Sequence, residues 1–336
     1  MALGPVVVAF SGGIDSSVIL ALAVHVAREH GYALPHPVAL TVPGSDDADE
    51  RDWRELVLAH LGLGPAEEID ARPHLELVGE QALRILEAVG PVIPPNAHAL
   101  LPILDQAHGA TVITGSGGDE LLDGAPRRFT SARRSGFRPT RAGLPGLLWA
   151  DAPHRLLRRH LRAHSPWHEA DWLRAPARAE LIDRQTEDDV SVPRGWAEST
   201  AALWRTRQFH ALRLATEVAG EVAGVPVLVP FERAEVFAAF AAHYGERFPG
   251  TRARMVNELA GDLLPDELIG RTSKALLGDA FFGPRTRAFA EQWDDAAGVN
   301  AGLVDLEAVR ASWLEPGGDY RTSLLLQQAW LESGCP

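Results

Sequence analysis

The stretch Val6-Val7-Val8-Ala9-Phe10-Ser11-Gly12-Gly13-Ile14-Asp15-Ser16-Ser17 decides the fold class. Its first five residues are apolar and predict a short buried strand, because a brief apolar run bounded by glycine is typical of strands. After the turn of small residues, Val18-Ile19-Leu20-Ala21-Leu22-Ala23 predicts a helix. A strand, a glycine-rich turn and a helix place a helix N-terminus where it can bind an anion, most often a phosphate.

The glycines and serines of this turn differ from two common phosphate-binding loops. No lysine follows the glycines, so the turn is not a Walker A loop. The third glycine of the dinucleotide-binding fingerprint is also missing. Asp15 lies inside the turn, where a carboxylate makes sense mainly if a metal ion links it to a phosphate. The alternative is an ordinary Gly-Asp turn ahead of a helix.

Strand and helix signals alternate over the first 125 residues. Further strands are expected at Pro37–Val42, Glu68–Ala71 and Thr111–Thr114, and helices at Asp49–Leu61, Leu75–Val89 and Ala97–His108. This alternation predicts an α/β fold, with a parallel twisted sheet and helices on both of its faces. In such sheets ligands bind at the carboxyl ends of the strands.

The second half of the chain has a different character. Ten arginines lie between Arg127 and Arg162, and we interpret 127–141 as a variable or mobile surface segment followed by a basic helix over 147–164. This basic surface is either a solvated face or a docking surface or lid for an acidic substrate. Helical signals dominate afterwards, at Ala201–Ala223, Ala234–His243, Arg252–Leu259, Arg285–Ala296 and Tyr320–Glu332. We therefore divide the chain into 1–125, an Arg-rich segment 126–165, and a largely helical part 166–336.

Composition excludes several classes of protein. No apolar run approaches the ~18–20 residues of a membrane span, and the N-terminus lacks the features of a signal peptide. We therefore expect a cytoplasmic protein. The formal charge of −13 argues against non-specific nucleic-acid binding. The one cysteine, Cys335, excludes an internal disulfide.

The basic residues are 31 arginines and a single lysine, Lys274, which together make the 32 of the composition. A lysine that persists in such a chain is a candidate for chemistry that needs a compact ammonium group rather than a planar guanidinium. The alternative is that one surface lysine survived by chance.

A second glycine-rich motif, Thr114-Gly115-Ser116-Gly117-Gly118-Asp119-Glu120, follows the strand expected at Thr111–Thr114. Its glycines permit a close approach of the backbone to a nucleotide. Asp119 is a second carboxylate at a strand end, and Mg²⁺ commonly binds one or two protein carboxylates together with phosphate oxygens. Asp15 and Asp119 would form that pair. Alternatively, Asp119 and Glu120 simply complement a helix dipole.

Taken together, the two motifs resemble the synthetase domain of asparagine synthetases and their relatives, the β-lactam synthetases and the lasso-peptide macrolactam cyclases. These belong to the N-type ATP pyrophosphatases, which cleave ATP between its α and β phosphates. The resemblance continues, in the same order, over roughly residues 5–285. It includes Ala48-Asp49-Glu50 and Leu264-Pro265-Asp266-Glu267-Leu268 followed by Arg271 and Lys274. It also includes Val229-Pro230-Phe231, which resembles the start of the family's Pro-Phe-Leu-Asp stretch, with the Leu-Asp replaced in the segment that begins at Glu232.

The resemblance implies an adenine nucleotide α-hydrolase-like fold, the cofactors ATP and Mg²⁺, and an active site that the helical C-terminal part completes. It assigns pyrophosphate binding to Ser11, Gly12, Gly13, Ser16 and Ser17, and Mg²⁺ binding to Asp15 and Asp119. It assigns the adenosine site to Phe10, Leu40, Thr41 and Gly115. Lys274 would stabilise the leaving pyrophosphate, and Asp119, Ser116 and Arg271 would complete the catalytic group.

Two departures from the family pattern affect the expected chemistry. Ser116 stands where relatives with a defined general acid or base carry Glu or Tyr, and serine is a poor base at neutral pH. The nucleophilic cysteine that follows Met in glutamine-using relatives is replaced by Ala2, and the first strand begins at Val6. We therefore expect a synthetase without the N-terminal glutaminase domain, which uses ammonia, an amine substrate or a partner subunit.

The resemblance predicts an AMP-forming carbon–nitrogen ligase that adenylates a carboxylate for attack by an amine. The Gly-Gly-Asp-Glu and Arg-Thr-Ser-Lys sequences look most like those of the lasso-peptide cyclases. This favours macrolactam formation on a ribosomal precursor peptide, possible partners being a leader-peptide-binding protein or a protease. The alternatives are a small-molecule amide synthetase, another ATP pyrophosphatase branch such as tRNA thiolation, and a non-catalytic nucleotide-binding protein.

Overall fold

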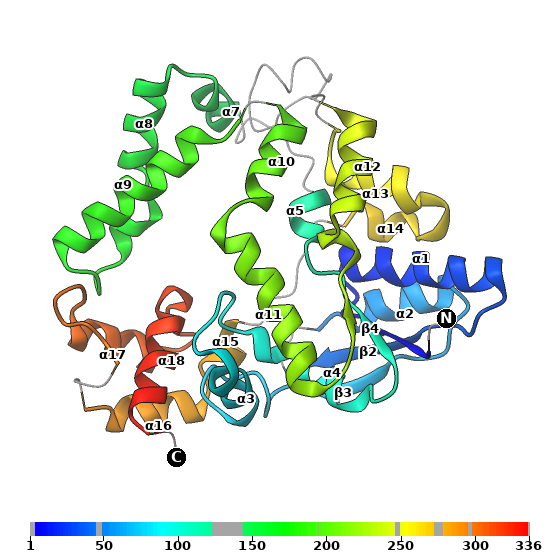
Figure 1. The fold of residues 1–336 in the computed structure, drawn as a ribbon, viewed down its shortest axis with the longest axis horizontal. Helices are drawn as coiled ribbons and strands as arrows, with labels where there is room; N and C mark the ends of the chain where they lie inside the picture. Colours follow the sequence, from blue (N-terminus) through cyan, green and yellow to red (C-terminus); the bar gives the residue numbers. More distant parts are fainter. Residues whose placement is uncertain are drawn as a thin grey trace.

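Five parallel strands form one sheet, in the order β3-β2-β1-β4-β5 (Figure 1). They are β1 (Val6–Ala9), β2 (His36–Thr41), β3 (Glu67–Asp70), β4 (Thr111–Ile113) and β5 (Val227–Leu228). The computed structural model describes residues 4–44, 49–122, 144–193, 195–245, 249–271, 278–294 and 298–334. The four strands expected from the sequence are confirmed. The fifth, β5, is too short to leave a clear pattern in the sequence.

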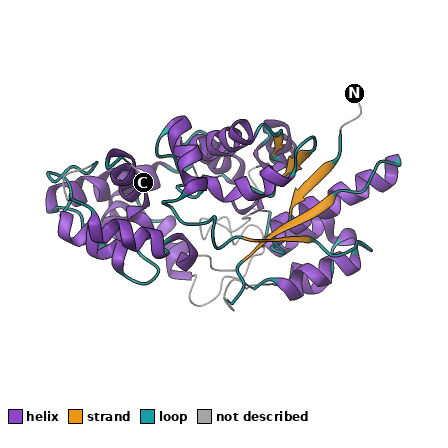
Figure 2. Ribbon diagram, turned by 90° about the horizontal axis from the view of Figure 1, so that it is seen from below, coloured by secondary structure: helices purple, strands orange, loops and turns teal. Residues whose placement is uncertain are grey.

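Helices cover both faces of the sheet (Figure 2). The alternation of buried side chains along β1 explains how one strand serves both faces. Val8 points into a core with α1 (Ile14–His30), α2 (Arg51–His60), α13 (Arg252–Ala260) and α14 (Asp266–Ile269). Val7 points the other way, into a core with α3 (Glu80–Val89), α4 (Leu101–Gln106) and α11 (Arg207–Ala223). Because successive strand residues face opposite sides, one short strand supplies both cores. The predicted doubly covered α/β sheet is therefore confirmed.

The helix expected over 75–89 begins only at Glu80, and this part of the prediction was wrong. Leu75 and Leu77 are almost fully buried against the C-terminal helices. The Leu77 amide donates a hydrogen bond to the Phe281 carbonyl at 3.1 Å. This backbone bond to a distant segment replaces the bond that a helix would make, so the apolar run packs between two layers instead of coiling.

Two other expected helices are each divided in two. The basic helix of 147–164 is α7 (Leu144–Ala150) and α8 (His154–Ala163), with Pro153 at the start of α8, because proline lacks the amide hydrogen that a helix interior needs. The long helix of 201–223 is α10 (Trp196–Trp204) and α11, where the Thr206 hydroxyl caps the new N-terminus by accepting from the Phe209 amide at 3.2 Å.

The C-terminal part is helical, as expected. Its remaining helices are α9 (Ala175–Ser191), α12 (Ala234–Tyr244), α15 (Gly278–Phe281), α16 (Pro284–Gln292), α17 (Leu306–Leu314) and α18 (Ser323–Glu332), whereas the short α5 (Gly118–Leu122) begins in the second glycine motif of the first part. Helices α7, α8 and α9 stand apart from the sheet in Figure 1. Helices α16–α18 share a third core with α3 and the 71–78 segment. None of the helices in the described ranges is long and apolar enough to cross a bilayer.

Candidate active site

The first glycine loop links β1 to α1 and is held by its own hydroxyls. Gly12 has a φ of +91°, a conformation that few residues other than glycine adopt. The Ser17 hydroxyl donates to the Gly13 carbonyl at 2.8 Å, and the Ser16 hydroxyl does so at 3.0 Å. Ser17 is fully buried, so we expect it to hold the turn, whereas Ser11 is exposed beside the N-terminus of α1.

The second glycine loop packs directly onto the first. A Cβ atom on Gly115 would lie 2.8 Å from the Ser16 amide nitrogen, and one on Gly118 would lie 2.4 Å from Cγ of Asp15. No side chain larger than hydrogen fits at either position without displacing the start of α1. The two motifs therefore form one continuous surface, and Gly115 and Gly118 are glycines because of this contact.

The strand order explains why the two loops meet. From β1 the chain adds β2 and then β3 on one side, whereas β4 and β5 lie on the other side. The order therefore reverses between β1 and β4, and the crevice outside such a reversal is where ligands bind in open α/β sheets. The two glycine loops follow β1 and β4, so both lie at the carboxyl ends of strands, as the sequence predicted.

Arg252 joins the two carboxylates that the sequence paired. Its Nη2 donates to Oδ1 of Asp15 at 2.5 Å, and its Nη1 donates to Oδ1 of Asp119 at 2.5 Å. Although burial opposes it, the two carboxylates hold the pKa of Arg252 above its ordinary value, so the guanidinium stays charged. Asp15 and Asp119 thus converge on one cationic group contributed by α13.

Beneath the first loop lies a buried ion pair between Glu50 and Arg271. Both nitrogens at the end of the Arg271 side chain donate to the Glu50 carboxylate, one of them at 3.0 Å, and both side chains are less than 10% exposed. Arg271 also donates to the Gly12 carbonyl at 3.2 Å and stacks over the ring of Trp53 at 4.8 Å. The guanidinium therefore reaches the loop through its backbone, which suits positioning of the loop.

Ser116 is bonded to a carboxylate from a distant part of the chain. Its hydroxyl donates to Oε1 of Glu232 at 2.8 Å, and Glu232 is only 5% exposed. Glu232 ends the short 3₁₀ turn Pro230–Glu232, which follows β5. The Glu232 carboxylate is therefore hydrogen-bonded to Ser116, the residue that stands where relatives carry a general acid or base.

The remaining expected residues are placed at the same edge of the sheet. The Phe10 side chain is 1% exposed and belongs to the core, so only its backbone can face a nucleotide. Leu40 and Thr41 are half-buried at the carboxyl end of β2, and the Thr41 hydroxyl donates to the Ile69 carbonyl at 3.3 Å. Lys274 and the arginines of 127–141 lie outside the described residues.

A sequence profile of the asparagine synthase family matches residues 1–332. The chain belongs to this family. No curated protein matches the chain. Membership makes the chain, in general terms, an ATP-dependent ligase that forms amide bonds from a carboxylate and an amine, and enzymes of this family use ATP, typically with Mg²⁺.

The carboxylates of Asp15 and Asp119 fit a nucleotide-bound magnesium ion. Asp15 and Asp119 already converge on one cation, and their oxygens are the ligands that Mg²⁺ prefers. Within the described ranges no cluster of three or more His, Cys, Asp or Glu side chains could hold a metal by itself. Two carboxylates supply only part of a metal's ligands, so the site suits a metal that is also held by phosphate oxygens. The buried Nε of Arg252 has no hydrogen-bond acceptor among the described residues.

The structure identifies three site residues that the sequence did not, namely Glu50, Arg252 and Glu232. Glu50 was noted only as part of a resembling segment, Arg252 only as the start of a helix, and Glu232 only where a family motif changes. The change at Glu232 was a usable signal, because a carboxylate had replaced an apolar residue. Arg252 had no such signal among 31 arginines.

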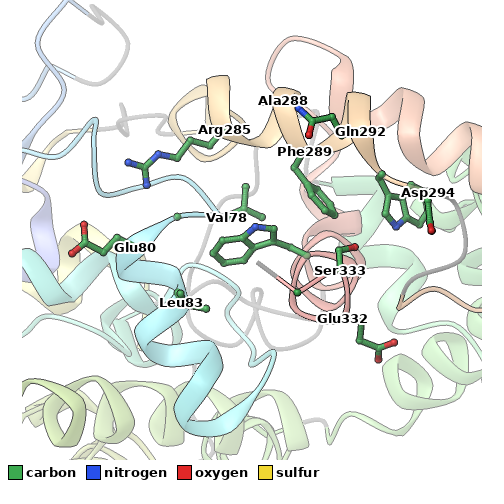
Figure 3. Close-up of a pocket in the computed structure, with 14 residues that line it drawn as sticks. Val78, Glu80, Leu83, Arg285, Ala288, Phe289, Gln292, Asp294, Glu332 and Ser333 are labelled. Atoms are coloured by element: carbon green, nitrogen blue, oxygen red, sulfur yellow. The ribbon is translucent and has the colours of Figure 1, made fainter. Parts of the chain in front are cut away.

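A separate cavity of about 1080 Å³ lies between α3 and the C-terminal helices. It is lined by parts of α3, α16 and α18, and no residue of the two glycine loops lines it. Figure 3 shows Val78 and Phe289 near its middle, with Glu80, Asp294 and Glu332 around them. The cavity marks the joint between the two layers and is distinct from the candidate active site.

Proposed function

We propose that this chain transfers a substrate carboxylate to the α-phosphate of ATP and then joins the resulting acyl group to an amine, with release of pyrophosphate and AMP. The observation that carries the proposal is the meeting of the two glycine loops at the reversal of strand order, with Asp15 and Asp119 converging on one cation. This arrangement combines a helix N-terminus for phosphate with carboxylates for a metal ion.

In the first step the substrate carboxylate oxygen attacks the α-phosphorus, and the bond to the β-phosphate oxygen breaks. The Ser11 hydroxyl and the loop amides at the start of α1 bind the pyrophosphate. Mg²⁺, held by Asp15 and Asp119, would neutralise the charge that develops on the leaving group. Lys274, as assigned by the resemblance, would add a point charge at the same place. Removal of one such stabilising group typically lowers turnover by ~10²–10³-fold.

In the second step the amine attacks the acyl carbon, and AMP leaves with the electron pair of the broken carbon–oxygen bond. Holding both substrates on one surface supplies much of the rate. The Glu50–Arg271 pair contributes indirectly, because it positions the Gly12 carbonyl and hence the loop that aligns the phosphates.

For the substrate, we propose a macrolactam formed within a ribosomal peptide, between an Asp or Glu side chain and the peptide N-terminus. The support is the form of the motifs around Asp119 and Arg271, together with the arginines of 127–162. Two of these arginines, Arg158 and Arg162 of α8, already form ion pairs with Glu187 and Asp183 of α9. A docking role therefore falls mainly on the remaining arginines.

The reaction class is tested with a carboxylate labelled with ¹⁸O, Mg²⁺ and ATP. The proposal expects AMP and pyrophosphate in equal amounts, with one ¹⁸O atom transferred to AMP. The detection of ADP and phosphate, or of AMP without the label, would contradict it. Asp15→Asn is the matched inactive variant.

The substrate class is tested separately, by offering peptides with a free N-terminus and an internal Asp or Glu in parallel with aspartate and ammonia. Cyclisation, seen as a loss of 18 Da by mass spectrometry, supports the peptide substrate. Asparagine formation without cyclisation supports the small-molecule alternative.

A further inference from the structure

The hydrogen bond between Ser116 and Glu232 joins two segments that are far apart in the chain. Ser116 belongs to the second glycine loop, and Glu232 follows β5 at the edge of the sheet. The loop is shaped to admit this carboxylate, because Gly117 has a φ of +80° and a Cβ atom there would lie 2.8 Å from Cγ of Glu232. The contact is therefore built into the backbone of the loop.

The surroundings of Glu232 make its carboxylate a stronger base than an ordinary glutamate. Burial raises the pKa of Glu232 above the ordinary value of a carboxyl group, while the Ser116 hydrogen bond and Arg213 lower it. The negative charges of Glu120 and Glu217 raise it further, and the net shift is upward. A base works best when its pKa lies close to the working pH.

Burial of this carboxylate needs a reason, because a buried charge costs free energy unless it is paired. Glu232 stands in the Pro230-Phe231-Glu232 segment, where the resembling family motif has an apolar leucine. The neighbouring Phe231 is 2% exposed, as an ordinary core residue would be. A carboxylate at the end of such a segment, bonded to the one loop residue that departs from the family pattern, indicates a functional pairing.

We propose that Ser116 and Glu232 together remove the proton from the attacking amine, in place of the acidic side chain that Ser116 replaces. This inference rests on the proposed function. As the carbon–nitrogen bond forms, the amine proton passes to Oγ of Ser116 while the Ser116 hydroxyl proton passes to Oε1 of Glu232. The carbon–oxygen bond to AMP then breaks, and AMP takes the electron pair. Ser116 is the catalytic residue of this relay, and Glu232 is the positioning residue and final proton acceptor.

The test separates the two half-reactions. Exchange of labelled pyrophosphate into ATP reports carboxylate activation, and amide formation reports the second step. Glu232→Gln keeps an oxygen that can accept from Ser116 but cannot take up a proton. We expect it to retain exchange within about 2-fold of the wild type and to lose about 10²-fold in amide formation, which is the usual size of a general-base contribution.

Two further variants complete the design. Glu221→Gln removes a charge from an exposed position of α11 that is not among the groups shifting the pKa of Glu232, and both half-reactions should stay near the wild-type rates. Ser116→Ala removes only the relay oxygen and should retain exchange while slowing amide formation. It therefore decides the matter if Glu232→Gln does not fold. The wild-type rate of amide formation should also fall as the pH drops through the pKa of Glu232, and this limb should disappear in Glu232→Gln.

The outcomes distinguish the two proposals. If the wild type shows no exchange with any carboxylate, the proposed function fails. If exchange and amide formation fall equally in Glu232→Gln and Ser116→Ala, the pair only supports the loop and the relay is wrong. Unchanged amide formation in both variants also overturns it.

Discussion

The carboxylates of Asp15 and Asp119 share one guanidinium, that of Arg252. Asp15 follows β1 and Asp119 follows β4, so the contact joins the two loops across the point where the strand order reverses. The two carboxylates therefore face a single positive charge at the centre of the site.

We expect Arg252→Gln to increase the dependence of thermal stability on Mg²⁺. Without the guanidinium the two carboxylates repel each other, and we expect a loss of about 1–2 kcal/mol, less than for a fully buried pair because Asp119 is half-exposed. Melting curves with and without Mg²⁺ and ATP measure the effect. Arg254→Gln, on the same helix but paired with Glu258, is the control. An identical Mg²⁺ response in wild type and Arg252→Gln would contradict the prediction.

We expect Gly115→Ala to abolish most pyrophosphate exchange. The added methyl group would meet the backbone of Asp15 and Ser16, which cannot move aside without shifting the whole start of α1. A displacement of about 1 Å in an aligned site can cost about 10²-fold in rate. Gly64→Ala, at a position with open space around it, should exchange at the wild-type rate. Pyrophosphate exchange rates of both variants, measured at saturating ATP, test this prediction.

We expect Arg271→Met to destabilise the fold by about 3–5 kcal/mol, because it leaves the buried Glu50 carboxylate without its guanidinium. The double change with Glu50→Leu should recover part of this loss, since a buried ion pair often contributes little more than apolar groups of similar volume. Urea denaturation measures both. Arg184→Ala, which breaks an exposed pair on α9, should leave the midpoint close to that of the wild type. A double variant as unstable as Arg271→Met would show that the lost packing, rather than the stranded charge, sets the cost.

The buried His98 should make stability depend on pH. Burial lowers its pKa to about 4, and it is 1% exposed with its ring near the Leu75 carbonyl at 3.1 Å. Because the folded-state pKa lies below the unfolded value, the unfolded chain takes up a proton first. This contribution therefore destabilises the fold as the pH falls from about 6.5 towards 4, and it reaches about 2 kcal/mol at pH 5.

The measurement is the free energy of unfolding between pH 7 and pH 5 in wild type and in His98→Gln, which keeps a donor for the Leu75 carbonyl. The slope should be smaller in the variant. His108→Gln, which removes an exposed histidine, serves as the control. Equal slopes in wild type and His98→Gln would contradict the prediction, because they would mean that the pKa of His98 is the same in the folded and unfolded chain.

Lys274→Arg should lower turnover by about 10²–10³-fold while ATP binding survives. The planar guanidinium keeps the charge but not the compact geometry of the ammonium group. ATP affinity from calorimetry and the rate of pyrophosphate release separate binding from chemistry. A variant that turns over at the wild-type rate would remove Lys274 from the active site.

The local parts of this fold were predictable. The strands around Val8 and Val112 are short apolar runs that stop at turns of small residues, and Gly90 ends its helix as expected. Predictions were wrong where a distant partner changed the local outcome. Leu77 shows this, because its amide bonds to Phe281 and its side chain packs under the C-terminal helices, so the helix starts later than its apolar pattern suggested.

The sequence by itself determined the two glycine loops, the carboxylates of Asp15 and Asp119 and the parallel α/β fold. These depend on neighbouring residues and on short periodic patterns. Only the tertiary structure decided that Arg252 lies between the two carboxylates and that Glu232 bonds to Ser116. Such contacts depend on the order of the strands and on the packing of α13 and of the segment after β5. These features bring together side chains that are far apart in the chain, so no local sequence pattern predicts them.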